Sequence, residues 1–295
     1  MNKHLVALLV AGLAAGGAFA QANDTLAKVK SAGKIVMGVR ESSAPLSYTL
    51  GDGKFVGYHV ELCERIVKAL APAAKIEYTP VTSANRIPLV QNGTVDIECG
   101  STTNNAARQK DVSFAFTTYV TEVRTAVKVA SGIKSIAQLN GKSVATTTGT
   151  TSVALLRRHE RANGVDFKEV YGKDHADSFL LLESGRADAF VMDDNILAGL
   201  IASSKSPKDF AIVGETLNVE PIAIMVRKDD AIKKAVDDQI VSMIKSGDLE
   251  KLYNKWFMTP IPPKNTSVNL PMGEVLKGLL KTPSDKPAED FNAKK

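Results

Sequence analysis

The stretch Cys99-Gly-Ser-Thr-Thr-Asn-Asn-Ala-Ala-Arg108 decides how we interpret this chain. A turn and then alternating apolar residues in Gly93–Glu98 predict a short strand before it. The small hydroxyl and amide side chains that follow predict the mouth of a strand-to-helix turn, whose free N–H groups attract anions. Arg108 adds a planar, permanently charged donor that can hold a carboxylate with two hydrogen bonds. The stretch therefore predicts an anion site, although a capped helix with a solvated arginine has the same local pattern.

Two earlier strands are predicted to end in similar turns. Lys34–Arg40 is a buried strand with an arginine at its end, and Lys75–Val81 is followed by Ser83 and Arg86. Ser83 or Thr82 is expected to cap the helix 86–92. Ligands of open α/β sheets bind beyond the carboxyl ends of the strands. Three arginine-bearing turns at this position predict one anion site, assembled from loops at one sheet edge.

The second half of the chain repeats this arrangement with different side chains. Thr150 and Thr151 follow the predicted strand Ser143–Thr147, and His175 and Asp193 lie near the ends of the next two strands. Asp193 is a natural partner for an ammonium group, and His175 can donate to a carboxylate. A capped histidine and a helix-capping aspartate are the alternative interpretations.

The order of the elements predicts an α/β fold of two lobes joined by a two-strand hinge. Thr117–Glu122 and Leu217–Pro221 are the expected hinge segments. The helices 136–142, 153–161 and 179–184 are expected in the second lobe, and the helix 272–280 in a tail with a disordered polar end. The expected division is a signal peptide at 1–20, lobe 1 at 21–117 and 222–263, lobe 2 at 118–221, and a C-terminal tail at 264–295.

Composition and targeting indicate an exported globular protein. The 295 residues are 44% hydrophobic and 23% charged, which excludes general disorder. Lys3, an uncharged run over 5–18 and an Ala-Phe-Ala ending predict a secretory signal peptide that is cleaved after Ala20, and hence a periplasmic protein. The net charge of +5 comes without the basic runs and interleaved aromatic residues of nucleic-acid binders, so no nucleic-acid partner is expected.

The cysteines and short motifs indicate neither a metal nor a cofactor. Cys63, on the predicted helix Tyr58–Leu70, and Cys99 can meet in one core, where a disulfide and two buried thiols are both possible. No metal-ligand spacing is present. Gly141-Lys142-Ser143 imitates the end of a phosphate-binding loop, but Ala137 occupies the position of the required first glycine.

The motifs together resemble the periplasmic amino-acid-binding proteins of ABC transporters, specifically the glutamate/aspartate-binding group of family 3 solute-binding proteins. The resemblance covers nearly all of the mature chain and implies a type II binding-protein fold that clamps its ligand between two lobes. It also implies a monomer that delivers L-glutamate or L-aspartate to a membrane permease. Its most specific pieces are Arg40–Ser43, Ser83–Gly93, Glu98–Asn105, Lys173–Ser178, Met192–Asp194, Trp256–Phe257 and Ile261–Asn265.

The resemblance also implies a role for each candidate residue. The α-carboxylate would be held by Arg108 with Thr103 and the Thr150–Thr151 turn, and the ammonium by Asp193 and Ser101. The remaining residues, around the side-chain carboxylate, are Arg40, Ser83, Arg86 and His175. Three arginines against one aspartate give the site a net charge of +2, which favours acidic over neutral amino acids because a buried charge must be paired.

Two other functions are compatible with the sequence. Some dehydratases of the arogenate or prephenate type share this fold, and His175 with Asp193 could act as acid and base. The chain lacks the Gly-x-Ser-x-Gly and Gly-x-Gly-x-x-Gly motifs, so we expect no catalytic residues. A binding protein that serves a chemoreceptor or sensor kinase is the second alternative.

Overall fold

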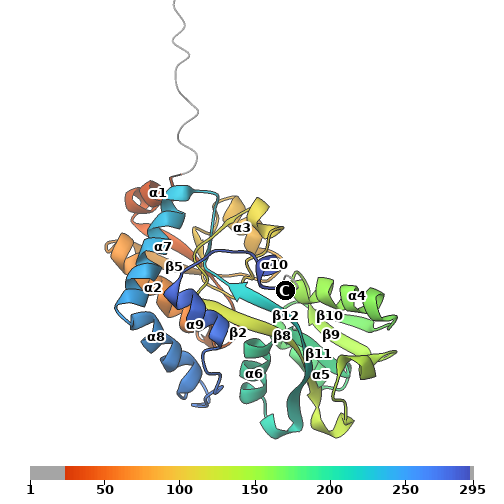
Figure 1. The fold of residues 1–295 in the computed structure, drawn as a ribbon. Coiled ribbons are helices and arrows are strands. Elements are labelled where there is room, and N and C mark those ends of the chain that lie inside the picture. The colour runs from red at the N-terminus through yellow and green to blue at the C-terminus, as the bar shows by residue number, and fades with distance from the viewer. Residues whose placement is uncertain (1–23, 293–295) are drawn as a thin grey trace, which may run out of the picture.

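A computed structural model describes residues 24–292 of the chain. The signal-peptide prediction falls on residues 1–20, outside the described residues. Figure 1 shows two lobes, with the long strands β8 (Tyr119–Lys128) and β12 (Phe210–Ile222) running from one to the other. The predicted fold class, α/β with two lobes joined by two strands, is confirmed. No helix within 24–292 is both long and apolar enough to cross a membrane.

The first lobe contains a five-stranded sheet in the order β5-β1-β6-β13-β7. Strand β1 pairs in parallel with β5 and β6, whereas β13 pairs antiparallel with β6 and β7. The strands are β1 (Lys34–Val39), β5 (Lys75–Pro80), β6 (Ile97–Glu98), β7 (Ser113–Phe114) and β13 (Met225–Val226), and the helices α1 (Thr25–Ala32), α2 (Tyr58–Leu70), α3 (Arg86–Gln91), α7 (Asp230–Lys245) and α8 (Asp248–Tyr253). A small antiparallel sheet of β2 (Ser42–Ser43), β3 (Ser47–Gly51) and β4 (Lys54–Val56) completes the lobe.

The second lobe contains a five-stranded sheet in the order β10-β9-β11-β8-β12. Strand β9 pairs in parallel with β10 and β11, and β8 runs antiparallel to β11 and β12. The remaining elements are β9 (Ser143–Thr147), β10 (Lys168–Gly172), β11 (Ala189–Asp193), α4 (Thr151–Asn163), α5 (His175–Glu183) and α6 (Asp194–Ser203). Because the three parallel strands point the same way, their following turns share one edge of the sheet.

The β8–β12 ladder carries the chain between the lobes. Its pairing extends to Tyr119↔Ile222, and the ladder is followed by main-chain hydrogen bonds into the first lobe, such as Ala115 N to Ile224 O at 2.9 Å. Both predicted hinge segments lie on this ladder or at its end. Two adjacent strands restrict relative movement of the lobes to bending or twisting about one line.

A disulfide joins Cys63 of α2 to Cys99, the residue after β6, with a Cα–Cα distance of 6.3 Å. Of the two possibilities that the sequence leaves open, a disulfide or two buried thiols, the structure has the disulfide. The bond ties the main helix of the first lobe to the strand whose end carries the hydroxyl-rich stretch. His59, also on α2, contacts the next carbonyl, with Nδ1 2.6 Å from the oxygen of Gly100.

Several local predictions are wrong. The stretch that ends at Arg108 leads into a single 3-10 turn, Arg108–Lys110, instead of an α-helix. Helix α3 has Asn85 as its N-cap, because Thr82 and Asn85 bond each other's main-chain N–H groups. The helix expected over 136–142 is the 3-10 turn Ile136–Leu139.

Two expected helices begin earlier than predicted, and the tail is ordered. Helix α4 starts at Thr151, and α5 starts at His175, which places this histidine in a helical first turn. The tail contains the expected helix as α9 (Glu274–Lys281). Its polar end was expected to be disordered, but as far as Asn292 it is ordered and forms α10 (Ala288–Phe291), which packs beside β12. Main-chain groups hold α10, as Ala288 N donates to Asn104 O at 2.9 Å.

Candidate functional site

Two buried arginines of the first lobe converge on Ser101. Arg40 (0% exposed) donates from Nη1 to Ser101 Oγ at 3.1 Å, and Arg86 (2% exposed) donates from Nη1 to Ser101 O at 3.1 Å. Burial lowers the pKa of Arg86 well below its usual value, and the charges of Arg108 and Arg40 lower it further. The three predicted turns therefore do meet, and they concentrate positive charge in one place.

Glycine at position 100 makes this convergence possible. A Cβ there would overlap the carboxylate of Glu98 and would lie 2.8 Å from Cγ of Arg40. Glu98 is itself fully buried and accepts the hydroxyl of Thr102 at 2.7 Å. Because position 100 is glycine, the Glu98 carboxylate and the aliphatic part of Arg40 can both lie against the space that a Cβ would fill.

Arg108 connects the first lobe to the second. Its Nη1 donates to Thr103 O at 2.9 Å, and its Nη2 donates to Gly149 O at 3.3 Å. Gly149 has φ of +81°, and a Cβ there would lie 2.7 Å from the main chain of Ala84. The turn before α4 therefore rests against the Ser83–Ala84 segment, and only glycine permits this contact. The two walls of the cleft are closed on each other in this structure.

The second lobe places Asp174 and His175 against Arg40. Asp174 Oδ1 lies 2.6 Å from Arg40 Nη2, and its Oδ2 accepts Ser42 Oγ at 2.8 Å. Burial alone would raise the pKa of Asp174, but Arg40, His175 and these hydrogen bonds lower it below its usual value. Asp174 is thus an ionised carboxylate that joins the lobes.

Both ring nitrogens of His175, which was predicted to donate to a ligand carboxylate, contact protein side chains. Its Nε2 lies 3.2 Å from Arg40 Nη2, which can only donate, so Nε2 is an acceptor. Its Nδ1 then carries the proton and donates to Thr147 Oγ1 at 3.0 Å. Burial and the charge of Arg40 lower the pKa of His175 to about 3, so the ring is neutral. His175 orients Arg40 instead.

Asp193 lies at the end of β11 and is buried, at 4% exposed. Burial raises its pKa well above the usual value, and the neighbouring carboxylates Glu220 and Asp194 raise it further, against the opposing charges of Arg86 and Arg108. A buried carboxylate in this setting gains from a cation in the cleft, because a positive charge nearby stabilises its ionised form.

The remaining candidate side chains differ in whether their polar atoms already have a hydrogen-bond partner. Ser83 Oγ and Arg86 Nε are buried and have no hydrogen-bond partner within residues 24–292, and the same holds for Arg40 Nε. The hydroxyl of Thr150 donates to Thr147 O at 2.7 Å within its own turn. The hydroxyls of Thr103 and Thr151 both donate to one carboxylate oxygen of Glu220, at 2.6 and 2.8 Å.

Sequence reasoning missed three acidic residues of the site. Glu98, Asp174 and Glu220 all lie among the arginines, so the expected net charge of +2 is wrong. Glu98 precedes the hydroxyl-rich stretch and Asp174 precedes His175, so both were adjacent to selected residues. Glu220 gave no such signal, because the hinge brings it to the site from a distant part of the sequence.

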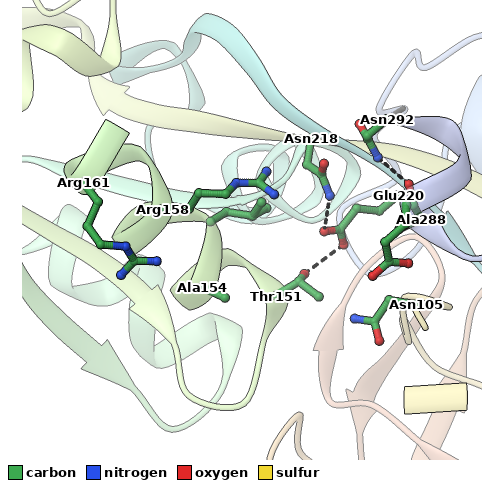
Figure 2. A pocket seen from close by; sticks show the side chains of 11 residues that line it. Asn105, Thr151, Ala154, Arg158, Arg161, Asn218, Glu220, Ala288 and Asn292 are labelled. Carbon is green, nitrogen blue, oxygen red and sulfur yellow. Dashed lines mark hydrogen bonds between the residues drawn. The ribbon is translucent and has the colours of Figure 1, made fainter. Parts of the chain in front are cut away.

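A cavity of about 360 Å³ opens beside the closed site at its hinge side. Figure 2 shows Thr151 and Glu220 on its wall, with Arg158 extending into the hollow from α4 and Asn292 from the end of α10 opposite. Within residues 24–292, no group of three or more His, Cys, Asp or Glu side chains could hold a metal ion.

Comparisons by sequence and by structure both find similarity to solute-binding proteins. Residues 35–259 match the bacterial extracellular solute-binding proteins, family 3. The chain is 44% identical to the glutamate/aspartate import solute-binding protein of Salmonella typhimurium, over 97% of this chain and 98% of the relative. It is 45% identical to the L-glutamate/L-aspartate-binding protein of Pseudomonas aeruginosa, over 97% of each chain. An arginine-binding protein mutant from T. maritima superposes with a TM-score of 0.72 at 26% identity, over 79% of this chain and 99% of that chain.

Proposed function

The chain belongs to the bacterial extracellular solute-binding proteins, family 3, and on this basis we propose that it captures L-glutamate or L-aspartate by closure of its two lobes and delivers it to an ABC permease. The relatives named for these two amino acids cover nearly the whole chain. We propose further that the lobes are residues 21–117 with 222–263 and residues 118–221, and that the β8–β12 ladder is their hinge.

The binding roles divide between the two walls of the cleft. Arg108 holds the α-carboxylate together with Thr103 and the Thr150–Thr151 turn. Asp193 and Ser101 face the ammonium group, whose positive charge favours the ionised form of the buried Asp193 carboxylate. The side-chain carboxylate is bound by Arg40, Ser83 and Arg86, with His175 as the residue that orients Arg40.

The buried donors at the Arg86 end of the cleft carry the preference for an acidic side chain. Arg86 Nε and Ser83 Oγ lie at one end of the site, and no described residue accepts from them. A carboxylate satisfies these donors and also neutralises charge that Arg40 and Arg108 make unfavourable. The preference therefore follows from where the donors lie and does not depend on the net charge of the site.

Titration calorimetry with glutamate and glutamine tests this proposal, because the two ligands differ only in the side-chain terminus. Leaving a buried charge without its partner costs about 2–5 kcal/mol, so glutamine should bind about 30-fold to several thousand-fold more weakly. Equal affinities would contradict the assignment. Glutamate and aspartate should differ less, since one methylene is worth about 1–3 kcal/mol.

The cellular role follows from the family and the amino terminus. We propose that the chain is exported through the signal peptide 1–20 and works in the periplasm as a binding protein without catalytic activity. A ligand changes the balance of open and closed forms only by its different affinity for them, and closure presents both lobes to the permease in one arrangement. X-ray scattering should show compaction on addition of glutamate.

A further inference from the structure

Glu220 joins the two walls of the cleft through one oxygen atom. It lies on hinge strand β12 and is fully buried, at 0% exposed. Its Oε2 accepts the hydroxyl of Thr103 from the first lobe at 2.6 Å and that of Thr151, the first residue of α4, at 2.8 Å. Its Oε1 accepts Asn218 Nδ2 at 3.0 Å, and Figure 2 shows the bonds from Thr151 and Asn218.

This arrangement uses the only proton that each hydroxyl has. A threonine hydroxyl donates one hydrogen bond, so a hydroxyl that donates to Glu220 cannot donate to a ligand carboxylate at the same time. Thr103 and Thr151 were expected to help hold the α-carboxylate. In the closed arrangement, that help has to come from another group on the same two residues.

The main-chain N–H groups of the two threonines are suited to this task. Thr103 pairs with Ile222 in a bridge whose hydrogen bonds run from Asn104 N to Pro221 O and from Ala223 N to Thr102 O. In such a pair the N–H of the central residue points away from the partner strand. Thr151 begins α4, where the N–H has no acceptor within the helix.

Arg108 contacts the main chain of both segments that carry these N–H groups. It donates to the carbonyl of Thr103 on one side and to the carbonyl of Gly149, two residues before Thr151, on the other. Burial lowers the pKa of Arg108, and Glu220 is the largest charge that opposes this shift. Glu220 therefore also helps to keep the guanidinium charged.

We propose that Glu220 is a positioning residue of the binding site, which ties back the hydroxyls of Thr103 and Thr151 so that their N–H groups and Arg108 together hold the α-carboxylate of the ligand. This inference rests on the proposed amino-acid-binding function. Because the two threonines reach one oxygen of Glu220 only when the walls are close, the contact also stabilises the closed form.

A double-variant cycle with Thr103→Val and Glu220→Gln tests the proposal, with L-glutamate as the ligand and calorimetry as the measurement. Each single change should weaken binding by about tenfold or more, since each removes a hydrogen bond to a charged group. If the Thr103 hydroxyl acts through Glu220, its removal should cost less than about threefold in the Glu220→Gln background. An equal cost in both backgrounds would show that the hydroxyl binds the ligand directly and would overturn the proposal.

Three further variants separate positioning from a general loss of structure. Thr103→Ser keeps the hydroxyl and should retain wild-type affinity. Glu169→Gln is the control, because Glu169 lies on β10 and pairs with Arg157, away from both the site and the hinge ladder. Stopped-flow binding should show a faster dissociation rate for Glu220→Gln with little change in the association rate. Wild-type affinity of a folded Glu220→Gln variant would refute the proposal.

The positioning role of Glu220 and the preference for acidic amino acids can be refuted separately. If a thermal-shift screen of the twenty amino acids finds another ligand, the preference for glutamate and aspartate is wrong, and the same cycle is run with that amino acid. Every amino acid carries an α-carboxylate, so coupling of Thr103 and Glu220 would still support the positioning role. Additive effects with any bound amino acid would refute it alone, and binding of no amino acid would refute both.

Discussion

The two walls of the cleft carry different balances of charged side chains. The first-lobe wall carries Arg40, Arg86 and Arg108 beside one buried acid, Glu98, whereas the second-lobe wall carries Asp174 and Asp193. Burial lowers the pKa of Arg86 on one wall and raises that of Asp193 on the other, and neighbouring like charges add to each shift. Only the closed arrangement brings the two sets together. Under the proposed function, an amino acid carries both signs of charge and therefore needs both walls.

The largest loss of ligand affinity should come from Arg86→Met, which removes a guanidinium from the first wall and leaves the second wall unchanged. Glutamate affinity should fall by at least about 30-fold, because the ligand carboxylate loses a buried charged partner. Calorimetry measures the loss. Arg157→Met is the matched control, since Arg157 is exposed on α4 and pairs with Glu169. A change smaller than threefold in Arg86→Met would remove this arginine from the site.

The walls also differ in covalent support, because Cys63–Cys99 crosslinks only the first lobe within the described residues. The double substitution Cys63→Ser and Cys99→Ser opens a loop of 36 residues. Urea unfolding should show a loss of about 4 kcal/mol in the free energy of unfolding. Glutamate affinity should change less than threefold if the sheet alone sets the geometry of Ser101. A large loss of affinity would show that the disulfide positions the site itself.

On the second wall, Asp193→Asn should weaken glutamate binding by about 10- to 100-fold, a smaller effect than loss of Arg86. The reason is that asparagine keeps a side-chain oxygen, which can still accept a hydrogen bond from the ammonium group. Glutarate, which has both carboxylates but no ammonium group, serves as the matched ligand. The ratio of glutamate to glutarate affinity should fall in the variant. An unchanged ratio would show that Asp193 does not face the ammonium.

The smallest expected effect is on the pH dependence of stability, to which one buried histidine in each lobe contributes. Burial lowers the pKa of His59 to about 4 and that of His175 to about 3, and both rings are neutral in the folded protein. The unfolded chain binds protons near pH 6.5, so acid favours unfolding between pH 6.5 and about 4. Each histidine should cost about 2 kcal/mol of stability between pH 7 and pH 5. Urea unfolding of His59→Gln and His175→Gln should show a shallower pH dependence than the wild type, and an unchanged dependence would contradict the neutral assignment.

The sequence predicted best those elements that hydrophobic spacing alone specifies. The bounds of α2 (Tyr58–Leu70), β9 (Ser143–Thr147) and α7 (Asp230–Lys245) agree with the structure. The two helices have an apolar helical face, and glycines stand near both ends of β9 and after α7. The single 3-10 turn after Arg108 and the early start of α5 at His175 were missed. These short segments are fixed by contacts with other parts of the chain, which propensity does not record.

The order of strands, turns and charged residues was enough to determine the two-lobed α/β fold and to select the loops that line the cleft, because strand ends of one sheet must share an edge. Only the tertiary structure showed that His175 accepts from Arg40, that Glu98, Asp174 and Glu220 lie among the arginines, and that the tail packs beside the hinge. The physical reason is distance along the chain. Hydrogen-bond direction and the summed field of buried charges depend on residues that meet only after folding, and closure brings Glu220 within bonding distance of two threonines that are 48 residues apart.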